Sequence, residues 1–174
     1  MDVSTAQSLI SNENFRFLKP ESWADLGCGN GTFTNALNNL LYPGSIVYAI
    51  DKKPVQFTTL PAQENEIRFI KANFEKDPLD LLNLDGILMA NSLHFVTDKE
   101  RLLMQLQKHF GRQIRFIIVE YDTMQSNNWV PFPIDFIHLE ALCRKINGFR
   151  LERIGETKSI FGNKNIYAAL IYTD

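Results

Sequence analysis

The most constraining stretch of the sequence is a glycine-rich turn at residues 27–31, which reads Gly-Cys-Gly-Asn-Gly and follows a short apolar run. Glycine has no Cβ atom, so Gly27, Gly29 and Gly31 can take positive φ angles and let a ligand approach the backbone closely. Apolar residues then recur at helical spacing, at Phe33, Ala36, Leu37, Leu40 and Leu41. The stretch therefore predicts a strand, a tight turn and a helix whose first N–H groups face a ligand site.

The spacing of these glycines separates two ligand classes. The dinucleotide fingerprint has two residues between its second and third glycines, whereas here only Asn30 separates Gly29 from Gly31. The Gly-x-Gly-x-Gly form, preceded on the strand by Asp25, resembles motif I of the class I S-adenosylmethionine-dependent methyltransferases. The resemblance implies S-adenosylmethionine as cofactor, with Asp25 accepting from its ammonium and the loop N–H groups, Cys28 included, binding its carboxylate. The alternative is an ordinary tight turn.

A second anchor is the carboxylate that ends the next apolar run. Residues 45–50 are apolar and β-branched, and Asp51 follows them 24 positions after Gly27. Rossmann-type sheets place a carboxylate here beside the ribose, where its oxygens accept from the 2′ and 3′ hydroxyls. Asp51 is therefore assigned to the cofactor site, together with the adjacent Lys52. The alternative role for Asp51 is to cap a helix that begins near Pro54.

Two further strand ends supply cofactor residues. Residues 67–72 alternate between apolar and polar side chains and are followed by Asn73 and Phe74. The resembled family has an Asp at the position of Asn73, where it accepts from the adenine amino group; an amide oxygen also accepts but carries no charge. Phe74 is expected either against the adenine face or in the core. Asn91 follows the continuous apolar run at 84–90 and completes the predicted cofactor set.

The loop after this fourth strand resembles motif IV of small-molecule methyltransferases. It reads Asn-Ser-Leu-His at residues 91–94 and lacks the Pro-Pro-Tyr that methyltransferases acting on base amines carry there. The implied reaction is in-line attack on the sulfonium methyl, with a general base needed only if the nucleophile must lose a proton. His94 is either that base or a structural hydrogen-bonding residue. Glu120 and Tyr121, after a fifth strand at 114–119, are catalytic candidates by position.

A long proline-flanked connection follows the fifth strand. Residues 123–133 contain Trp129 and Phe132, and loops of this length in compact domains are often functional. The aromatic pair predicts a wall for the methyl acceptor, against the alternative that these rings pack back onto an N-terminal helix. That helix is expected within residues 1–19, with Ser4 as its cap, and forms a candidate substrate lid.

The alternation of strands and helices predicts the fold. The remaining patterns are helical after Pro54 and at 98–110 and 134–146, and strand-like at 151–160 and 165–172, with a hairpin turn at 161–164. We predict an α/β fold with a doubly wound, mostly parallel seven-stranded sheet, helices on both faces and a C-terminal antiparallel hairpin. The resembled family has this layout, which here spans residues 20–174 as the S-adenosylmethionine-binding domain. Ligands bind beyond the carboxyl ends of such strands, and all the predicted site residues fall on that rim.

Composition limits the other functional classes. The 174 residues carry a formal net charge of −2, which gives no general attraction to nucleic acid, and the basic residues Lys108, Arg112 and Arg115 are expected to form a solvated face at the opposite edge. The two cysteines suggest neither a disulfide scaffold nor a metal site, and no apolar run of about 18 residues predicts a membrane span. We expect a cytoplasmic enzyme with a small-molecule acceptor and no metal, membrane or nucleic acid partner. Homo-oligomerisation stays open.

Two other functions remain open alongside this one. The chain could hold S-adenosylmethionine or its product without catalysis, since few residues precede the first strand to cover a substrate. It could also methylate a macromolecule through an open site. An NAD-dependent oxidoreductase is disfavoured by the glycine spacing. His109 and His138 are expected outside the site, the first on the surface and the second half-buried in a helix.

Overall fold

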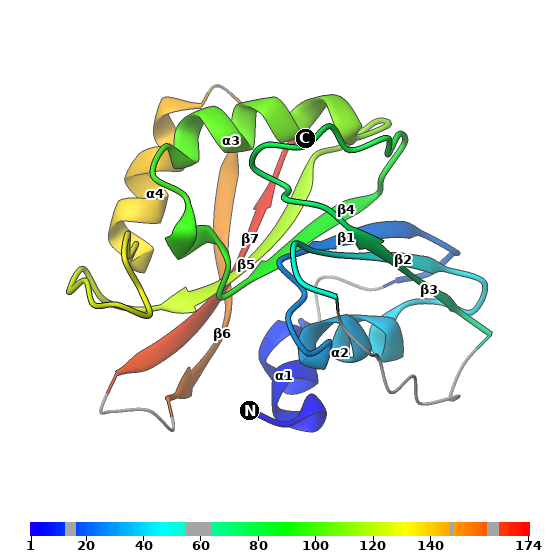
Figure 1. Cartoon of the computed structure of the whole chain (residues 1–174), viewed down its shortest axis with the longest axis horizontal. Coiled ribbons are helices and arrows are strands. Elements are labelled where there is room, and N and C mark those ends of the chain that lie inside the picture. Colours follow the sequence, from blue (N-terminus) through cyan, green and yellow to red (C-terminus); the bar gives the residue numbers. More distant parts are fainter. Residues whose placement is uncertain (13–16, 55–63, 147, 160–163) are drawn as a thin grey trace.

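The computed structural model describes residues 1–12, 17–54, 64–146, 148–159 and 164–174. Within these residues one seven-stranded sheet has the strand order β3-β2-β1-β4-β5-β7-β6 (Figure 1). The strands are β1 (Ser22–Leu26), β2 (Ile46–Asp51), β3 (Glu66–Lys71), β4 (Gly86–Ala90), β5 (Arg115–Tyr121), β6 (Arg150–Lys158) and β7 (Asn165–Tyr172). The first five strands pair in parallel, and β7 pairs antiparallel with both β5 and β6. The predicted sheet and its antiparallel terminal pair are confirmed.

Helices cover both faces of this sheet, as the doubly wound prediction requires. The helices α1 (Val3–Ile10) and α2 (Thr32–Leu40) pack on one face, and α3 (Lys99–Leu106) and α4 (Phe136–Lys145) pack on the other (Figure 1). Two short 3-10 turns, η1 (Leu93–Phe95) and η2 (Gln107–His109), lie on either side of α3. The helix predicted after Pro54 would lie largely within residues 55–63, which are outside the described residues, as is most of the predicted turn at 161–164.

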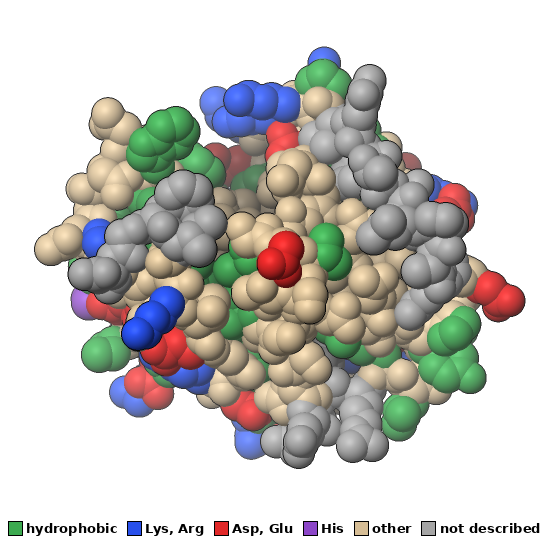
Figure 2. Space-filling model, turned by 90° about the horizontal axis from the view of Figure 1, so that it is seen from below, with side chains coloured by type: hydrophobic (Ala, Val, Ile, Leu, Met, Phe, Trp, Pro, Cys, Tyr) green, Lys and Arg blue, Asp and Glu red, His purple; other side chains and the backbone are tan. Residues whose placement is uncertain are grey.

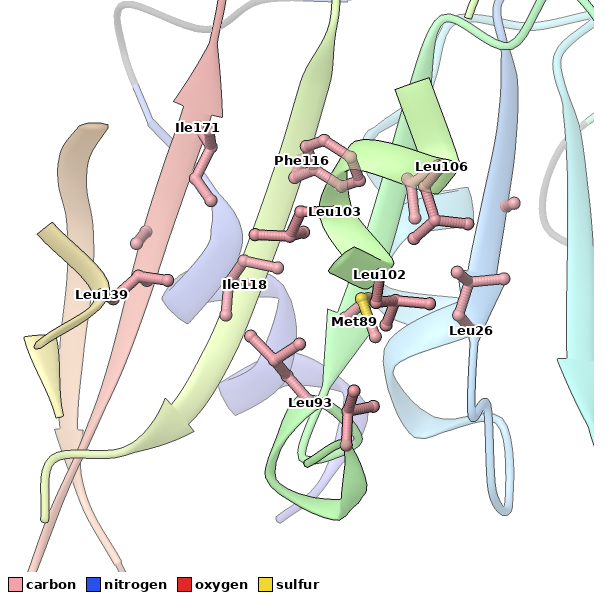
Figure 3. Close-up of a cluster of buried hydrophobic side chains, with 14 of the residues drawn as sticks. Leu26, Met89, Leu93, Leu102, Leu103, Leu106, Phe116, Ile118, Leu139 and Ile171 are labelled. Carbon is pink, nitrogen blue, oxygen red and sulfur yellow. The ribbon is translucent and has the colours of Figure 1, made fainter. Parts of the chain in front are cut away.

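The central strands are held between two apolar cores. Figure 3 shows the larger core, in which side chains of β4 and β5 meet side chains of the α3 and α4 face. Its labelled members are Leu26, Met89, Leu93, Leu102, Leu103, Leu106, Phe116, Ile118, Leu139 and Ile171. The inner residues of β4 and β5 are buried on both faces, as their continuous apolar runs predict. This packing fixes the carboxyl ends of the two strands relative to each other.

The N-terminal helix begins earlier than expected. The Asp2 carboxylate, and not Ser4, caps it by accepting from the Thr5 N–H at 2.8 Å, and the helix ends at Ile10. A carboxylate at this position also complements the positive end of the helix dipole, which a hydroxyl does not. The buried face of α1 then packs against α2, β6 and β7.

Three polar side chains away from the rim were placed wrongly by the sequence. Arg115 is not part of a solvated face, because its Nη2 lies 2.9 Å from Glu21 and its Nε donates to the Asp85 carbonyl oxygen at 2.7 Å. His109 is buried with Nδ1 2.6 Å from the Leu81 carbonyl oxygen, whereas His138 is exposed. The partners of Arg115 and His109 lie far away in the sequence, and the exposure of His138 depends on how its helix packs.

A glycine in β6 marks the place where α1 crosses the sheet. The register of β6 with β7 shifts between Arg153 and Gly155. A Cβ atom at Gly155 would lie 2.2 Å from the carbonyl oxygen of Leu9 in α1. This distance is far below van der Waals contact, so glycine is required for the helix to pack this closely on the strand.

Gly155→Ala is therefore expected to lower the free energy of unfolding by about 1–3 kcal/mol, because backbone must move to admit the methyl group. Denaturant unfolding measures the change. Gly111→Ala is the matched control, since its Cβ atom would meet Asn83 at an ordinary 3.5 Å. The control should change stability by less than about 0.5 kcal/mol. Equal effects of the two substitutions would contradict the tight contact between α1 and β6.

Candidate functional site

The turn between β1 and α2 has the predicted glycine conformation. Gly27, Gly29 and Gly31 have φ angles of 80°, 53° and 82°. A Cβ atom at Gly27 would lie 2.6 Å from Ser92 Cβ, whereas one at Gly29 would meet no atom within 4 Å. Gly27 thus packs against the loop after β4, and Gly29 faces open space. Figure 2 views the molecule from below, where most of the central surface is backbone and uncharged polar side chains.

The end of β2 holds this turn in place. The carbonyl oxygen of Ile50 accepts from the N–H groups of Gly27 and Cys28 at 2.8 and 3.0 Å. Asp51 accepts from the Gly29 N–H through Oδ2 at 3.0 Å and from the Lys53 N–H through Oδ1 at 2.9 Å. The loop donors predicted to face a ligand are therefore largely used inside the protein. Each Asp51 oxygen keeps a lone pair for a further donor.

Asp25 presents a buried carboxyl group beneath the turn. Its side chain is almost fully buried, and Oδ2 accepts from the Thr34 hydroxyl at 2.6 Å. Oδ1 has no hydrogen-bond partner among the described residues. Burial raises the pKa of Asp25 to about 7, the Thr34 hydrogen bond opposes this rise, and the nearby charge of Asp51 adds to it.

Two more polar atoms without partners lie in the loop that touches Gly27. Asn91 has a positive φ of 52°, and its N–H donates to the Val119 carbonyl oxygen at 2.8 Å. Among the described residues, Asn91 Oδ1 and Ser92 Oγ are buried without hydrogen bonds, as is Asp25 Oδ1. A buried polar atom left unpaired costs about 1–3 kcal/mol. Three such atoms around one turn favour a ligand that brings hydrogen-bond donors.

Asn73 and Phe74 follow β3 at the same edge. Asn73 Oδ1 accepts from the Glu75 N–H at 3.1 Å, and the Asn73 N–H donates to Asp77 at 2.8 Å. The Phe74 ring comes within 3.4 Å of the position of a Cβ at Gly27 and also packs against the larger core. The expected core position of Phe74 is thus confirmed, and the ring also contacts the glycine turn, whereas its place against the adenine stays a prediction.

His94 and Glu120 form a buried pair at the carboxyl ends of β4 and β5. His94 Nδ1 lies 2.6 Å from Glu120 Oε2, and the His94 backbone N–H donates to Oε1 at 3.0 Å. Their exposed fractions are 3% and 1%. Because a carboxylate accepts from Nδ1, the neutral ring carries its lone pair on Nε2. Nε2 makes no hydrogen bond within the part of the chain that the structure describes.

Aromatic side chains surround this pair. The Phe95 and Tyr121 rings have centroids 4.4 and 6.4 Å from that of His94. The Phe132 N–H donates to the His94 carbonyl oxygen at 3.0 Å, which ties the long connection to the site. Trp129 is 83% exposed, so the alternative that it packs onto the N-terminal helix is wrong.

Four residues at the site were missed by the sequence analysis. They are Thr34, Ser92, Phe95 and Lys99. Ser92 and Phe95 flank residues that were named, so proximity along the chain was a usable signal. Thr34 and Lys99 are brought to the site only by the direction of α2 and α3, which the residue pattern does not show.

The described segments hold neither a cluster of metal-binding side chains nor a membrane-spanning helix. No group of three or more His, Cys, Asp or Glu residues there could hold a metal ion. None of the helices in these segments is long and apolar enough to cross a membrane.

Comparisons with known proteins show the family and the fold. A family described as a methyltransferase domain matches residues 17–167. The fold is similar to that of a 1,6-didemethyltoxoflavin-N1-methyltransferase from Burkholderia thailandensis, solved with its substrate and S-adenosylhomocysteine (TM-score 0.68, 17% identity, 99% of this chain and 78% of that chain covered). The fold is also similar to that of an S-adenosylmethionine-dependent methyltransferase from Aquifex aeolicus (TM-score 0.61, 16% identity, 98% of this chain and 98% of that chain covered). A magnesium protoporphyrin IX methyltransferase from Synechocystis is similar too (TM-score 0.63, 17% identity, 96% of this chain and 76% of that chain covered). No curated protein matches in sequence.

The raised pKa of Asp25 predicts a pH-dependent stability. Its folded pKa of about 7 lies above the ordinary aspartate pKa of 3.8, so the folded protein holds the proton more tightly. The resulting stabilisation is fully present below the ordinary pKa and is lost as the pH rises through about 7, by up to roughly 4 kcal/mol. Asp25→Asn cannot ionise. The variant should therefore exceed the wild type in stability at about pH 8 and match it near pH 4. Urea unfolding across this range would contradict the prediction if the difference did not change with pH.

Proposed function

Because the chain belongs to the methyltransferase-domain family, we propose that it transfers the methyl group of S-adenosylmethionine to a small-molecule acceptor. The observation that carries this proposal is the set of buried acceptor atoms around the glycine turn, Asp25 Oδ1, Asn91 Oδ1 and Ser92 Oγ. They suit the ammonium of the cofactor, which is a donor only. When bound, the cofactor supplies an electrophilic methyl group on a cationic sulfur.

The residues present also fit the ribose and the adenine of this cofactor. Asp51 stands at the end of β2 with a lone pair left on each oxygen, which suits the two ribose hydroxyls. Gly29 faces open space beside it, and Lys52 is exposed next to it. Phe74 and Asn73 offer an apolar face and an amide at the next strand end for the adenine. Gly31, the residue just before α2, has no side chain that would cover the turn.

His94 is the proposed general base. Glu120 accepts from Nδ1 and from the backbone N–H of His94, so the ring is held in one orientation. Nε2 takes the proton of the acceptor as the acceptor atom attacks the methyl group, and ionised Glu120 stabilises the imidazolium that forms. Tyr121 and Phe95 border the ring and exclude water from it. An acceptor with an O–H, N–H or S–H group fits this arrangement.

The neighbouring structures support a small-molecule acceptor. The Burkholderia enzyme is solved with 1,6-didemethyltoxoflavin, and the Synechocystis enzyme acts on magnesium protoporphyrin IX. Residues 1–19 remain a candidate lid, since α1 packs on α2, the helix that follows the glycine turn. A protein that only holds the cofactor has no need of an oriented histidine beside exposed aromatic rings, which favours the enzyme over the binding protein.

Calorimetry tests the cofactor assignment. S-adenosylhomocysteine should bind and NAD should not, because the tight glycine spacing does not admit a pyrophosphate. Asp51→Ala should weaken S-adenosylhomocysteine binding by at least about tenfold, since hydrogen bonds to a charged group contribute roughly 1.5–3 kcal/mol. The control is Asp98→Ala, which removes the carboxylate that caps α3 at the Arg101 N–H. It should lower the melting temperature and leave the affinity unchanged. Unchanged affinity in Asp51→Ala would contradict the ribose role.

A second test addresses catalysis. S-adenosylhomocysteine formation is followed over a panel of small phenols, amines and thiols, and His94→Asn is compared with the wild type on any acceptor found. Asn keeps a donor near the position of Nδ1 for Glu120 but has no base, so the rate should fall about 10²–10⁴-fold with cofactor affinity within about twofold. His138→Asn, which removes an exposed histidine, is the control. Cofactor binding with no turnover across the panel would favour the binding protein.

A further inference from the structure

A half-buried lysine stands at the acceptor side of the site without a carboxylate partner. Lys99 Nζ donates to the Val96 carbonyl oxygen at 2.7 Å and lies 6.0 Å from the centroid of the Phe132 ring. Among the described residues it forms no ion pair, although Asp98 and Glu100 are its neighbours in sequence. Burial lowers the pKa of Lys99, and the charge of Glu120 opposes this effect.

Lys99 is connected to the proposed catalytic pair through Phe132. Phe132 donates its N–H to the His94 carbonyl oxygen, and Glu120 is held by His94. Lys99 therefore stands on the same side of the site as the proposed base. Among the described residues Glu120 forms its ion pair with His94 and lies beyond ion-pair distance of Lys99, so it is not a direct partner of the ammonium. The positive charge is left for a group that comes from outside the protein.

Two exposed aromatic rings lie near this lysine and near His94. Phe95 is 51% exposed and its ring centroid is 4.4 Å from that of His94, while Phe132 is also exposed on the side of Lys99. Rings that stay exposed beside a buried polar pair offer flat apolar surface to a planar ligand. One ammonium matches one negative charge on such a ligand.

We propose that Lys99 selects the methyl acceptor by binding its carboxylate, and that the acceptor is an aromatic acid whose ring lies against Phe95 and Phe132. The nucleophilic O–H, N–H or S–H of this acid then points to His94 Nε2, which removes the proton as the bond from the acceptor atom to the methyl carbon forms and the bond from that carbon to sulfur breaks, so that S-adenosylhomocysteine is the leaving group. The inference rests on the proposed function, because it names the acceptor class of that site. It makes Lys99 a specificity-determining residue and not a base.

The test compares carboxylates with neutral analogues of the same shape. Hydroxybenzoates, aminobenzoates and mercaptobenzoates are titrated into the protein saturated with S-adenosylhomocysteine, each beside its carboxamide. At least one carboxylate should bind about tenfold or more tightly than its amide, and the ratio should fall at high salt. Lys99→Met keeps the apolar stem and should reduce the ratio to within about twofold, whereas Lys99→Arg should retain most of it. Lys108→Met, which removes an exposed lysine from η2, should leave it unchanged.

Three results would overturn the inference: equal binding of acids and amides by the wild type, a ratio that survives in Lys99→Met, or no binding of any acid. The wild-type ratio stands even if a variant is unstable, so the test does not depend on the folding of Lys99→Met. Failure of S-adenosylhomocysteine to bind in the same titrations would instead refute the proposed function. Binding of the cofactor product without discrimination between acid and amide refutes only the role of Lys99.

Discussion

The hydrogen bonds from the glycine turn to the end of β2 set the chemistry of the whole site. Ile50 and Asp51 accept hydrogen bonds from the N–H groups of Gly27, Cys28 and Gly29, so these donors are used within the protein. What remains unpaired nearby is a set of acceptors on Asp25, Asn91 and Ser92. A ligand that completes this site must therefore bring donors, and an amino group with two ribose hydroxyls does so.

The same hydrogen bonds fix the shape of the turn from within the protein. A loop held only by a ligand would lose its shape without one, whereas here β1 and β2 are adjacent parallel strands and their ends define the turn. The buried carboxyl of Asp25 works against stability once it ionises, because burial disfavours its charge. A bound ammonium offsets that cost. The site is thus most stable when occupied, while the fold persists through the packing of the central strands.

Sequence patterns determined the parts of this picture that depend on local chemistry. Positive φ angles at the glycines, the carboxylate after β2 and the mostly parallel sheet with its antiparallel terminal pair follow from the residue types and from the rules for parallel connections. Contacts between residues that are distant in the sequence could not be predicted from these patterns. His109 finds the Leu81 carbonyl oxygen 28 positions away, and Lys99 reaches Phe132 through the packing of α3. Nor does a glycine motif show that its own N–H groups are already engaged, because the acceptors come from another strand.

The proposed cofactor and acceptor halves of the site stand on different strand pairs. The cofactor half uses the ends of β1 and β2, and the acceptor half uses the ends of β4 and β5, with β1 and β4 hydrogen-bonded to each other at the centre of the sheet. Asn91 and Ser92 connect the two halves, since the Asn91 N–H donates to β5 and Ser92 packs against Gly27. In the proposed function the loop after β4 therefore links the cofactor half to His94, three residues after Asn91. The described contacts of the acceptor half stay within it: Lys99 contacts Val96 and Phe132, and Phe132 donates its N–H to the His94 carbonyl oxygen. Substitutions at Lys99 or Phe132 are therefore expected to change acceptor binding more than cofactor binding.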